Sequence, residues 1–258
     1  QIGVGYKWLQ VAVGKDFTLA IQSDSTLWAW GSNYYGQLGN GSNFSQFTPV
    51  KIGSATNWKN VVAGDWHCVG IKSDGSLWAW GRNTVGQLGN GTNSNQNVPL
   101  KISTNDTWQE LAAGSSLTLA IKSDGTLWAW GYNGDGQLGN GTFNDQNSPI
   151  KIGQTNNWKK ISTGNYLTTA IKSDGTLWAW GRNYNGLENG TTTVQNSPQQ
   201  IGTANNWHQV SSGDHTIALK NDGTIWSWGS NEYGQLGNGN SGIEIIPIKI
   251  NCSTPTET

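Results

Sequence analysis

Apolar and polar residues alternate along this chain in short runs, and glycine residues separate the runs. Residues 117–121 read Leu-Thr-Leu-Ala-Ile, and residues 126–130 read Thr-Leu-Trp-Ala-Trp. Short runs that alternate with a period of two and are rich in β-branched and aromatic residues are typical of β-strands. No segment shows the 3.6-residue period of an amphipathic helix. The pattern therefore predicts an all-β fold made of many short strands.

The strand pattern recurs about every fifty residues. A single tryptophan opens each copy, at steps of 50, 50, 50 and 49 residues, and a Trp-Ala-Trp or Trp-Ser-Trp triplet follows it. Such a period predicts structural units that bury their apolar faces against one another. The predicted repeats are residues 3–52, 53–102, 103–152, 153–201 and 202–250, which form one domain within residues 1–250, followed by a linker or tail at 251–258.

Turn signals divide each copy into four strands. Asp-Gly stands between two strand-like runs in copies two to five and supplies the positive φ angles of a tight hairpin, whereas the first copy has Asp24-Ser25, which predicts a poorer turn. A proline opens the last predicted strand, where a missing N–H does least harm. These prolines are Pro49, Pro99, Pro149, Pro198 and Pro247. Four antiparallel strands repeated around an axis are typical of the blades of a β-propeller.

The Trp-Ala-Trp strand predicts how blades pack. Trp128 and Trp130 should point to one face of the blade, and Leu127 and Ala129 to the other. A bulky face on one blade can then nest against a small face on the next, so the paired tryptophans are predicted to be core residues. The alternative is a row of exposed platforms on which sugars stack.

The ends of the repeat array bear on whether the propeller closes. Only a short stub that starts Gln1-Ile2-Gly3 precedes Trp8, whereas the last copy ends in a complete strand pattern at residues 247–250. We expect a five-bladed ring first, and an arc of five consecutive blades from a larger ring as the alternative.

Composition restricts the possible partners. The formal net charge is −1 and charged residues make up 12%, so the chain lacks the basic patch that nucleic acid or an anionic membrane requires. No apolar run approaches the ~20 residues of a membrane-spanning helix. We therefore expect neither nucleic-acid binding nor membrane insertion. A chain that begins with Gln1 and contains no Met is what removal of a signal peptide would leave, so the predicted location is secreted or at the cell surface.

Few residues of the chain are suited to catalysis or metal binding. The three histidines are spread along the sequence, and His67 and its neighbour Cys68 should face opposite sides of a strand. The Asp of each Asp-Gly pair is interpreted as a turn residue rather than a calcium ligand. Gly-Gln-Leu-Gly-Asn-Gly lacks the Lys-Ser/Thr ending of a phosphate-binding loop. We expect no catalytic residues, no metal and no cofactor, and hence a protein that is not an enzyme.

These motifs resemble the regulator of chromosome condensation (RCC1-like) repeat, in which Gly and His-Thr-x-Ala precede Asp-Gly, a Trp-Gly strand and Gly-Gln-Leu-Gly. The last motif stands here at residues 36–39, 86–89, 136–139 and 234–237. The resemblance implies a propeller, most often of seven blades in that family, and a bacterial-type secreted member. It also implies recognition of other proteins. Members that exchange nucleotide on a small GTPase carry an inserted wedge. No such insertion stands between the evenly spaced repeats of this chain, so we do not expect nucleotide exchange.

Two sets of loop positions change from copy to copy while their neighbours stay the same. One is the pair that follows the recurrent Asn, and the other is the pair that follows the glycine after the first strand. Loops usually carry function, and Tyr and Trp are typical contact residues. The candidate binding residues are Tyr34, Tyr35, Asp65, Trp66, Asp135, Tyr166, Tyr184, Asp214, Glu232 and Tyr233.

The regular blades, the lack of catalytic groups and these loop aromatics together predict a recognition module that binds another protein through its loops. The alternative is a carbohydrate-binding lectin with repeated glycan sites between the blades.

Overall fold

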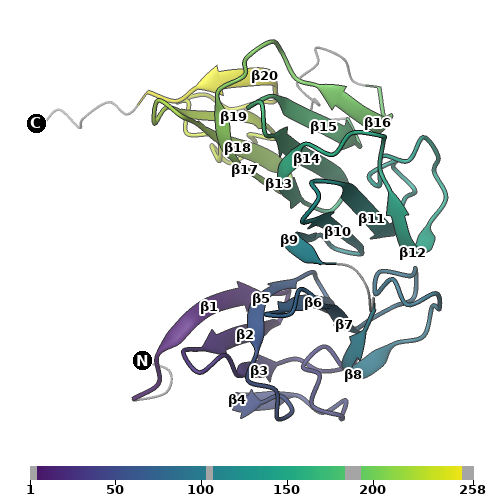
Figure 1. Ribbon diagram of the computed structural model, residues 1–258. Helices are drawn as coiled ribbons and strands as arrows, with labels where there is room; N and C mark the ends of the chain where they lie inside the picture. Colours follow the sequence, from purple (N-terminus) through teal and green to yellow (C-terminus); the bar gives the residue numbers. More distant parts are fainter. Residues whose placement is uncertain (1–4, 103–106, 184–192, 252–258) are drawn as a thin grey trace, which may run out of the picture.

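The computed structural model describes residues 5–102, 107–183 and 193–251, and these contain strands and turns without a helix. The strands form five four-stranded antiparallel sheets, each with its strands side by side in chain order (Figure 1). The predicted five blades of an all-β propeller are thus confirmed. The strands are β1 (Trp8–Val13), β2 (Phe17–Gln22), β3 (Leu27–Gly31), β4 (Gln46–Lys51), β5 (Trp58–Ala63), β6 (His67–Lys72), β7 (Leu77–Gly81), β8 (Gln96–Lys101), β9 (Trp108–Ala113), β10 (Leu117–Lys122), β11 (Leu127–Gly131), β12 (Gln146–Lys151), β13 (Trp158–Thr163), β14 (Leu167–Lys172), β15 (Leu177–Gly181), β16 (Gln195–Gln200), β17 (Trp207–Ser212), β18 (His215–Lys220), β19 (Ile225–Gly229) and β20 (Glu244–Lys249).

The core lies between the blades, as the alternation of large and small residues predicts. Leu27 and Ala29 of the first blade pack against Trp58 and Trp80 of the second. Trp80 has no exposed surface, and its Nε1 donates a hydrogen bond of 2.9 Å to the carbonyl of Gln37 on the preceding blade. The next two junctions repeat this bond with the same length. Because these indoles are sealed between sheets, they cannot serve as exposed platforms.

The other tryptophan of each triplet lies at the edge of the junction and is half-buried. Trp78 Nε1 donates to Ser76 Oγ, and Ser76 donates in turn to Asp74 Oδ1, at 2.9 and 2.6 Å. The hydrogen bond from the Ser76 side chain, followed by the one from the Ser76 backbone N–H, lowers the pKa of Asp74. The ammonium of Lys72 lies 3.7 Å from the centre of the Trp78 ring. The recurrent Asp is therefore a turn residue, as predicted.

The hairpin turns follow the predicted chemistry. Gly75 has a φ of +79°, and Ser25, which replaces this glycine in the first copy, is forced to +61°. Left-handed backbone costs a residue with a side chain roughly 1–2 kcal/mol. The first hairpin is thus the poorer one, as expected.

The proline prediction needs a correction. Pro49 lies inside β4, which begins three residues earlier at Gln46, rather than opening it. β4 is the outermost strand of its blade, and its pairing with β3 is irregular between Ala29 and Gly31. An edge strand tolerates proline in its interior because one side of its backbone needs no partner. The sequence pattern predicted this strand correctly but placed its first residue at the proline instead of at Gln46.

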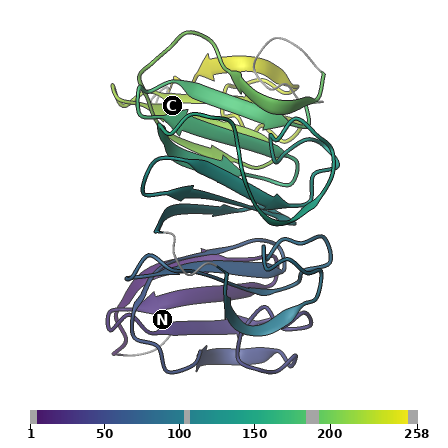
Figure 2. The same ribbon diagram turned by 45° about the vertical axis from the view of Figure 1, so that its right-hand side comes forward.

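The five blades form an open arc. The innermost strands β1, β5, β9, β13 and β17 contact one another in sequence around the axis. Figures 1 and 2 show the first blade (purple) and the fifth blade (yellow-green) at opposite ends of this arc. Apolar residues on both end faces stay exposed, among them Val11 at 58% and Ile225 at 44%. The preferred expectation of a five-bladed ring is therefore wrong, and the alternative of an arc describes these residues.

Candidate functional site

The two sets of variable loop positions meet on one end of the propeller. Turns of an antiparallel meander alternate between its two ends, so the turn after the first strand and the turn after the third strand of each blade share one end. At the junction between the first and second blades, the second loop of one blade lies beside the first loop of the next, because the ring centres of Tyr35 and Trp66 are 5.7 Å apart. We call this end of the molecule the loop face.

The junction between the first and second blades carries an aromatic group with two cations, here called the 1–2 cluster: Tyr34, Tyr35, Trp66, Lys15 and Arg82. Tyr34 and Tyr35 meet edge to face at 4.9 Å, and Tyr34 is 75% exposed. The Arg82 guanidinium lies 5.2 Å from the Tyr35 ring and the Lys15 ammonium 5.6 Å from the Trp66 ring. These distances allow cation–π attraction, and the cluster offers aromatic and positively charged surface together.

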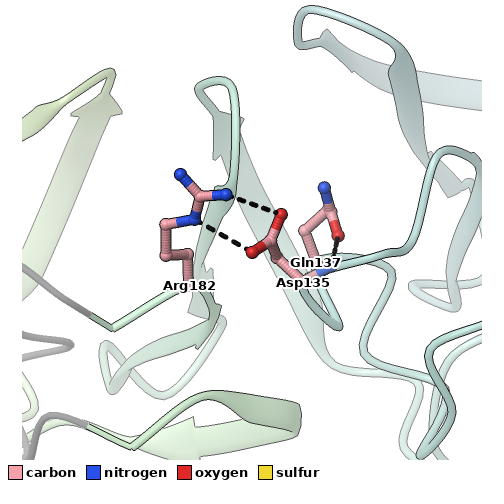
Figure 3. A network of polar contacts seen from close by, with 3 residues as sticks. All are labelled: Asp135, Gln137 and Arg182. Atoms are coloured by element: carbon pink, nitrogen blue, oxygen red, sulfur yellow. Dashed lines mark hydrogen bonds and ion pairs between the residues drawn. The ribbon is translucent and has the colours of Figure 1, made fainter.

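The junction between the third and fourth blades has the same plan but different charge. Arg182 lies 3.6 Å from the centre of the Tyr166 ring and forms a two-pronged ion pair with Asp135, at 2.9 and 3.2 Å (Figure 3). The backbone N–H of Asp135 donates to Gln137 Oε1 at 3.0 Å, which holds the loop in place. Burial, followed by the charges of Asp135 and a second carboxylate, raises the pKa of Tyr132 beside this pair. At this junction the Asp135 carboxylate neutralises the charge of Arg182.

A hollow of about 480 Å³ lies among the loops that follow the first strands of the first four blades, and glycines, small apolar residues and polar residues line it. Asp65 lies in its wall and accepts a hydrogen bond of 2.7 Å from Ser115 Oγ of the third blade. The carbonyl of Asp65 accepts one from the backbone N–H of Lys15. Asp65 therefore ties neighbouring loops together.

The remaining candidates do not join the 1–2 cluster. Asp214, Glu232 and Tyr233 belong to the fifth blade, at the other end of the arc, and all are exposed, Tyr233 by 90%. Tyr184 lies outside the described residues.

Arg82 and Arg182 were missed by the sequence analysis, although a signal for them existed. Each follows the glycine that ends the third strand of its blade, a position that also varies from copy to copy between two invariant neighbours. The residues there are Ser32, Arg82, Tyr132, Arg182 and Ser230. Lys15 lay within the variable loops but was not singled out, because an isolated lysine in a loop is ordinary.

His67 and Cys68 face opposite sides of their blade, as predicted. His67 Nε2 lies 2.9 Å from Thr118 Oγ1 of the third blade, whereas Cys68 Sγ points to the Gln37 carbonyl of the first. Burial lowers the pKa of His67 to about 3 and raises that of the Cys68 thiol. Among the residues described, no three His, Cys, Asp or Glu side chains gather as a metal site would require. No helix in the described part of the chain is long and apolar enough to span a membrane.

Comparison with known families matches the repeat itself. The model of the regulator of chromosome condensation (RCC1) repeat matches residues 24–71, 74–121, 124–171, 174–219 and 222–257. A second model with the same description matches residues 8–37, 58–87, 108–137, 158–187 and 208–235. No protein with a curated description matches the chain.

Solved structures share the fold. Human WBSCR16 superposes with a TM-score of 0.86 at 22% identity, over 96% of this chain and 68% of its own. Prp20p from Saccharomyces cerevisiae, studied with its binding to Gsp1p and histones, gives 0.84 at 21% identity, over 97% of this chain and 64% of its own. Yeast RCC1 (Prp20) bound to Kap60 gives 0.84 at 20% identity, over 97% and 62%. The chain thus spans about two thirds of the length of these structures, and at such identities the likeness concerns the fold.

Proposed function

The chain belongs to the family of RCC1 repeat proteins, and on that premise we propose that it is a non-enzymatic recognition module that binds another protein through its loop face. Two similar structures are of one yeast protein that is described with protein partners, as Prp20p with Gsp1p and histones and as yeast RCC1 (Prp20) bound to Kap60. We place this recognition outside the cell or at its surface, and fractionation of the producing culture tests that setting.

The main support for this proposal is the composition of the 1–2 cluster. Tyr, Trp and Arg are the residue types that dominate binding energy at protein interfaces. Tyr34, Tyr35 and Trp66 come from two blades and form one continuous aromatic surface. A surface assembled in this way suits a partner that lies across the junction.

The loop that carries Tyr34 and Tyr35 is held rigidly. Asn33 is fully buried, its Oδ1 accepts from the Leu38 N–H at 2.9 Å, and its Nδ2 donates to the carbonyls of Ser42 and Phe44 at 2.9 and 3.1 Å. A contact surface that is ordered before binding loses less conformational entropy when a partner arrives. The repeat frame therefore supports the contact residues as well as the fold.

The charge of the cluster indicates which groups a partner would present. Within the described residues no carboxylate lies within ion-pair distance of Lys15 or Arg82, in contrast to Arg182 with Asp135. The Arg82 guanidinium donates a 3.1 Å hydrogen bond from its Nε to Thr84 Oγ1. A partner that places carboxylate or carbonyl oxygens over Tyr35 and Trp66 could form ion pairs or hydrogen bonds with the side chains of Lys15 and Arg82.

Capture of extracellular proteins on the immobilised chain, identified by mass spectrometry and then titrated singly, tests the proposal. Trp66→Ala and Tyr35→Ala should each weaken binding of the captured partner by about tenfold or more, which corresponds to a loss of ~1.4 kcal/mol or more. Ser116→Ala and Val85→Ala change the equivalent positions one junction further on and serve as controls. Equal binding by all four variants would remove the 1–2 cluster as the contact surface.

The alternative of a lectin with equivalent glycan sites between blades predicts repeated open surfaces. The loop positions instead differ between junctions, with Trp66, Ser116 and Tyr166 at one equivalent place. A glycan array tests this alternative. A sugar that binds on the array, and that a titration then shows to occupy several sites per molecule, would favour the lectin over protein recognition.

A further inference from the structure

The side of the propeller opposite the loop face is rich in lysine. We call it the hairpin end, because it consists of the turns between the second and third strands, the links between blades and the strand residues that border them. Lysine ends the second strand in four blades and the fourth strand in four blades, and Lys59 and Lys159 follow the tryptophan that opens a blade. The strand-ending lysines are Lys72, Lys122, Lys172 and Lys220 for the second strand and Lys51, Lys101, Lys151 and Lys249 for the fourth.

Carboxylates are fewer at this end and more numerous at the other. Among the described residues, the hairpin end holds five carboxylates, those of the turn aspartates, which is half the number of these ten lysines. The loop face has the opposite balance, with Lys15, Arg82 and Arg182 as its cations. Its described carboxylates are Asp16, Asp65, Asp135, Asp145, Asp214, Glu232 and Glu244. The net charge of −1 therefore conceals a basic end and an acidic end, and the topology creates a basic patch that the net charge did not predict.

The lysines that end the fourth strands are available to an external anion. Lys51, Lys101, Lys151 and Lys249 are exposed, and within the described residues no carboxylate lies within ion-pair distance of them. They are still close to the turns, since the hydrogen bonds from Ser76 and, more weakly, the charges of Lys101 and Lys72 lower the pKa of Asp74. The hairpin end thus presents alternating positive and negative groups with an excess of positive charge.

A hollow of about 340 Å³ opens at this end between the first and second blades. Lys51 of the first blade and Lys72 of the second both line it, together with Ser54 and Trp58. The Lys72 ammonium lies 3.7 Å from the centre of the Trp78 ring and 4.9 Å from that of Trp58, which holds it in place. Two lysines from neighbouring blades therefore border one hollow, a setting that attracts a carboxylate or sulfate group.

We propose that the hairpin end binds a linear acidic polysaccharide that crosses several blades and places one carboxylate or sulfate group in the hollow between Lys51 and Lys72. Its hydroxyl groups would contact the Ser-Asp turns and the links at 53–57, 153–157 and 202–206, which are rich in amide and hydroxyl side chains. This surface lies opposite the loop face, so the inference is independent of the proposed function. It also differs from the lectin alternative, because one polymer crosses the blades instead of separate sugars each occupying an equivalent site.

The mixture of charges favours a polymer whose anionic groups are widely spaced. The turn aspartates accept hydrogen bonds from sugar hydroxyls but repel closely spaced phosphates, and duplex DNA carries one charge about every 1.7 Å. The strand-ending cations are lysines, whereas Arg82 and Arg182, of the type preferred for phosphate and nucleic-acid recognition, lie on the loop face. The turns read Ser-Asp-Gly at 73–75, 123–125 and 173–175 and carry none of the aromatic or aliphatic side chains that enter a membrane surface.

Titration of the chain at low salt with polygalacturonate, dextran sulfate and uncharged dextran tests the inference. Both acidic polymers should bind and dextran should not, and the affinity should fall as salt is added, because charge drives the association. The ratio of the two affinities shows whether carboxylate or sulfate is the preferred group. Failure of both acidic polymers to bind at low salt would overturn the inference.

Substitution of lysine by glutamine locates the site. Gln200 stands at the end of the fourth strand in the fourth blade, so the repeat already accepts glutamine at this position. The triple variant Lys51→Gln, Lys101→Gln, Lys151→Gln should weaken polysaccharide binding by about tenfold or more and reduce its salt dependence. The reverse change, Gln200→Lys, should strengthen binding. Thermal midpoints of the variants verify that each one is folded.

Lys160→Gln is the matched control. Lys160 forms an ion pair of 3.0 Å with Glu110 inside the first-strand layer, and Gln209 occupies the equivalent position of the fifth blade. This variant should change the affinity by less than about twofold. Equal affinities of the triple variant and Lys160→Gln would refute the assignment to the hairpin end. Tighter binding of duplex DNA or of phosphatidylserine vesicles than of either acidic polysaccharide would overturn it as well, since nucleic acid or a membrane surface would then be the occupant.

Discussion

The interior junctions and the two ends of the arc are built from equivalent residues of the repeat, yet these residues differ in what surrounds them. Val61 is fully buried against the first blade, while Val11, its equivalent, is 58% exposed at the open end. Full burial of such a side chain stabilises a protein by roughly 1.5–3 kcal/mol. The contribution of a repeat position therefore depends on whether a neighbouring blade is present, and matched substitutions in different repeats measure that contribution.

The largest difference is expected for the inner tryptophan of the triplet. Trp130→Ala empties a fully buried site and removes one of the two donors to the Gln87 carbonyl, which keeps the hydrogen bond from Thr118 Oγ1, so it should lower the free energy of unfolding by roughly 3–5 kcal/mol. Trp30→Ala at the open end should cost less than half of that. Denaturant unfolding of the two variants measures both values. Equal losses would show that the first blade is packed as tightly as the interior ones.

The next largest effect is a pH dependence that belongs to an interior junction. Burial holds the pKa of His67 at about 3, below its ordinary value of 6.5, so between these pH values the unfolded chain binds a proton that the folded chain does not. Stability should therefore fall as the pH drops from 6.5 toward 3, by up to roughly 1.4 kcal/mol per pH unit.

His67→Leu, which introduces the residue found at the equivalent positions 117 and 167, should flatten this part of the profile. Thermal midpoints of both proteins from pH 7 to pH 4 provide the measurement. Parallel profiles would assign the acid sensitivity to other groups.

A smaller difference is expected at the first glycine of the Gly-Gln-Leu-Gly motif. Gly36 and Gly234 have nearly the same φ, +79° and +75°, so alanine carries a similar conformational penalty at both places. Only Gly36→Ala also forces a Cβ against the Asn97 backbone of the next blade. We expect Gly36→Ala to be worse than Gly234→Ala by roughly 1–3 kcal/mol in chemical unfolding. A difference near zero would show that the junction yields to the added methyl group.

The smallest effect separates the first hairpin from the others. Ser25→Gly relieves a left-handed serine and should raise stability by about 0.5–1 kcal/mol, since the gain is partly offset by the greater freedom of glycine in the unfolded chain. The reverse change, Gly75→Ser, should destabilise the second blade, where a Cβ would also lie 3.1 Å from Thr107. Differential scanning calorimetry of the two variants checks both signs.

Much of the fold could be predicted because its signals are local. Alternation at 127–130 placed the tryptophans and the small residues on opposite faces, and Asp-Gly marked the hairpins. The proline within β4 was misplaced because edge strands tolerate it at more than one point. The candidate loops were found as variable positions, but the pairing of Tyr35 with Trp66, and of Arg182 with Asp135, joins residues 31 and 47 positions apart on different blades.

The sequence by itself therefore determined the repeat unit, its four strands, its turns and the two complementary faces of each blade, since neighbouring residues and a period of two specify all of these. Only the tertiary structure decided that the arc stays open and that cations and aromatics gather at one junction while an ion pair forms at another. The angle between packed blades sets the curvature of the arc and brings distant loops together, and this angle arises from contacts across each junction rather than from any single repeat.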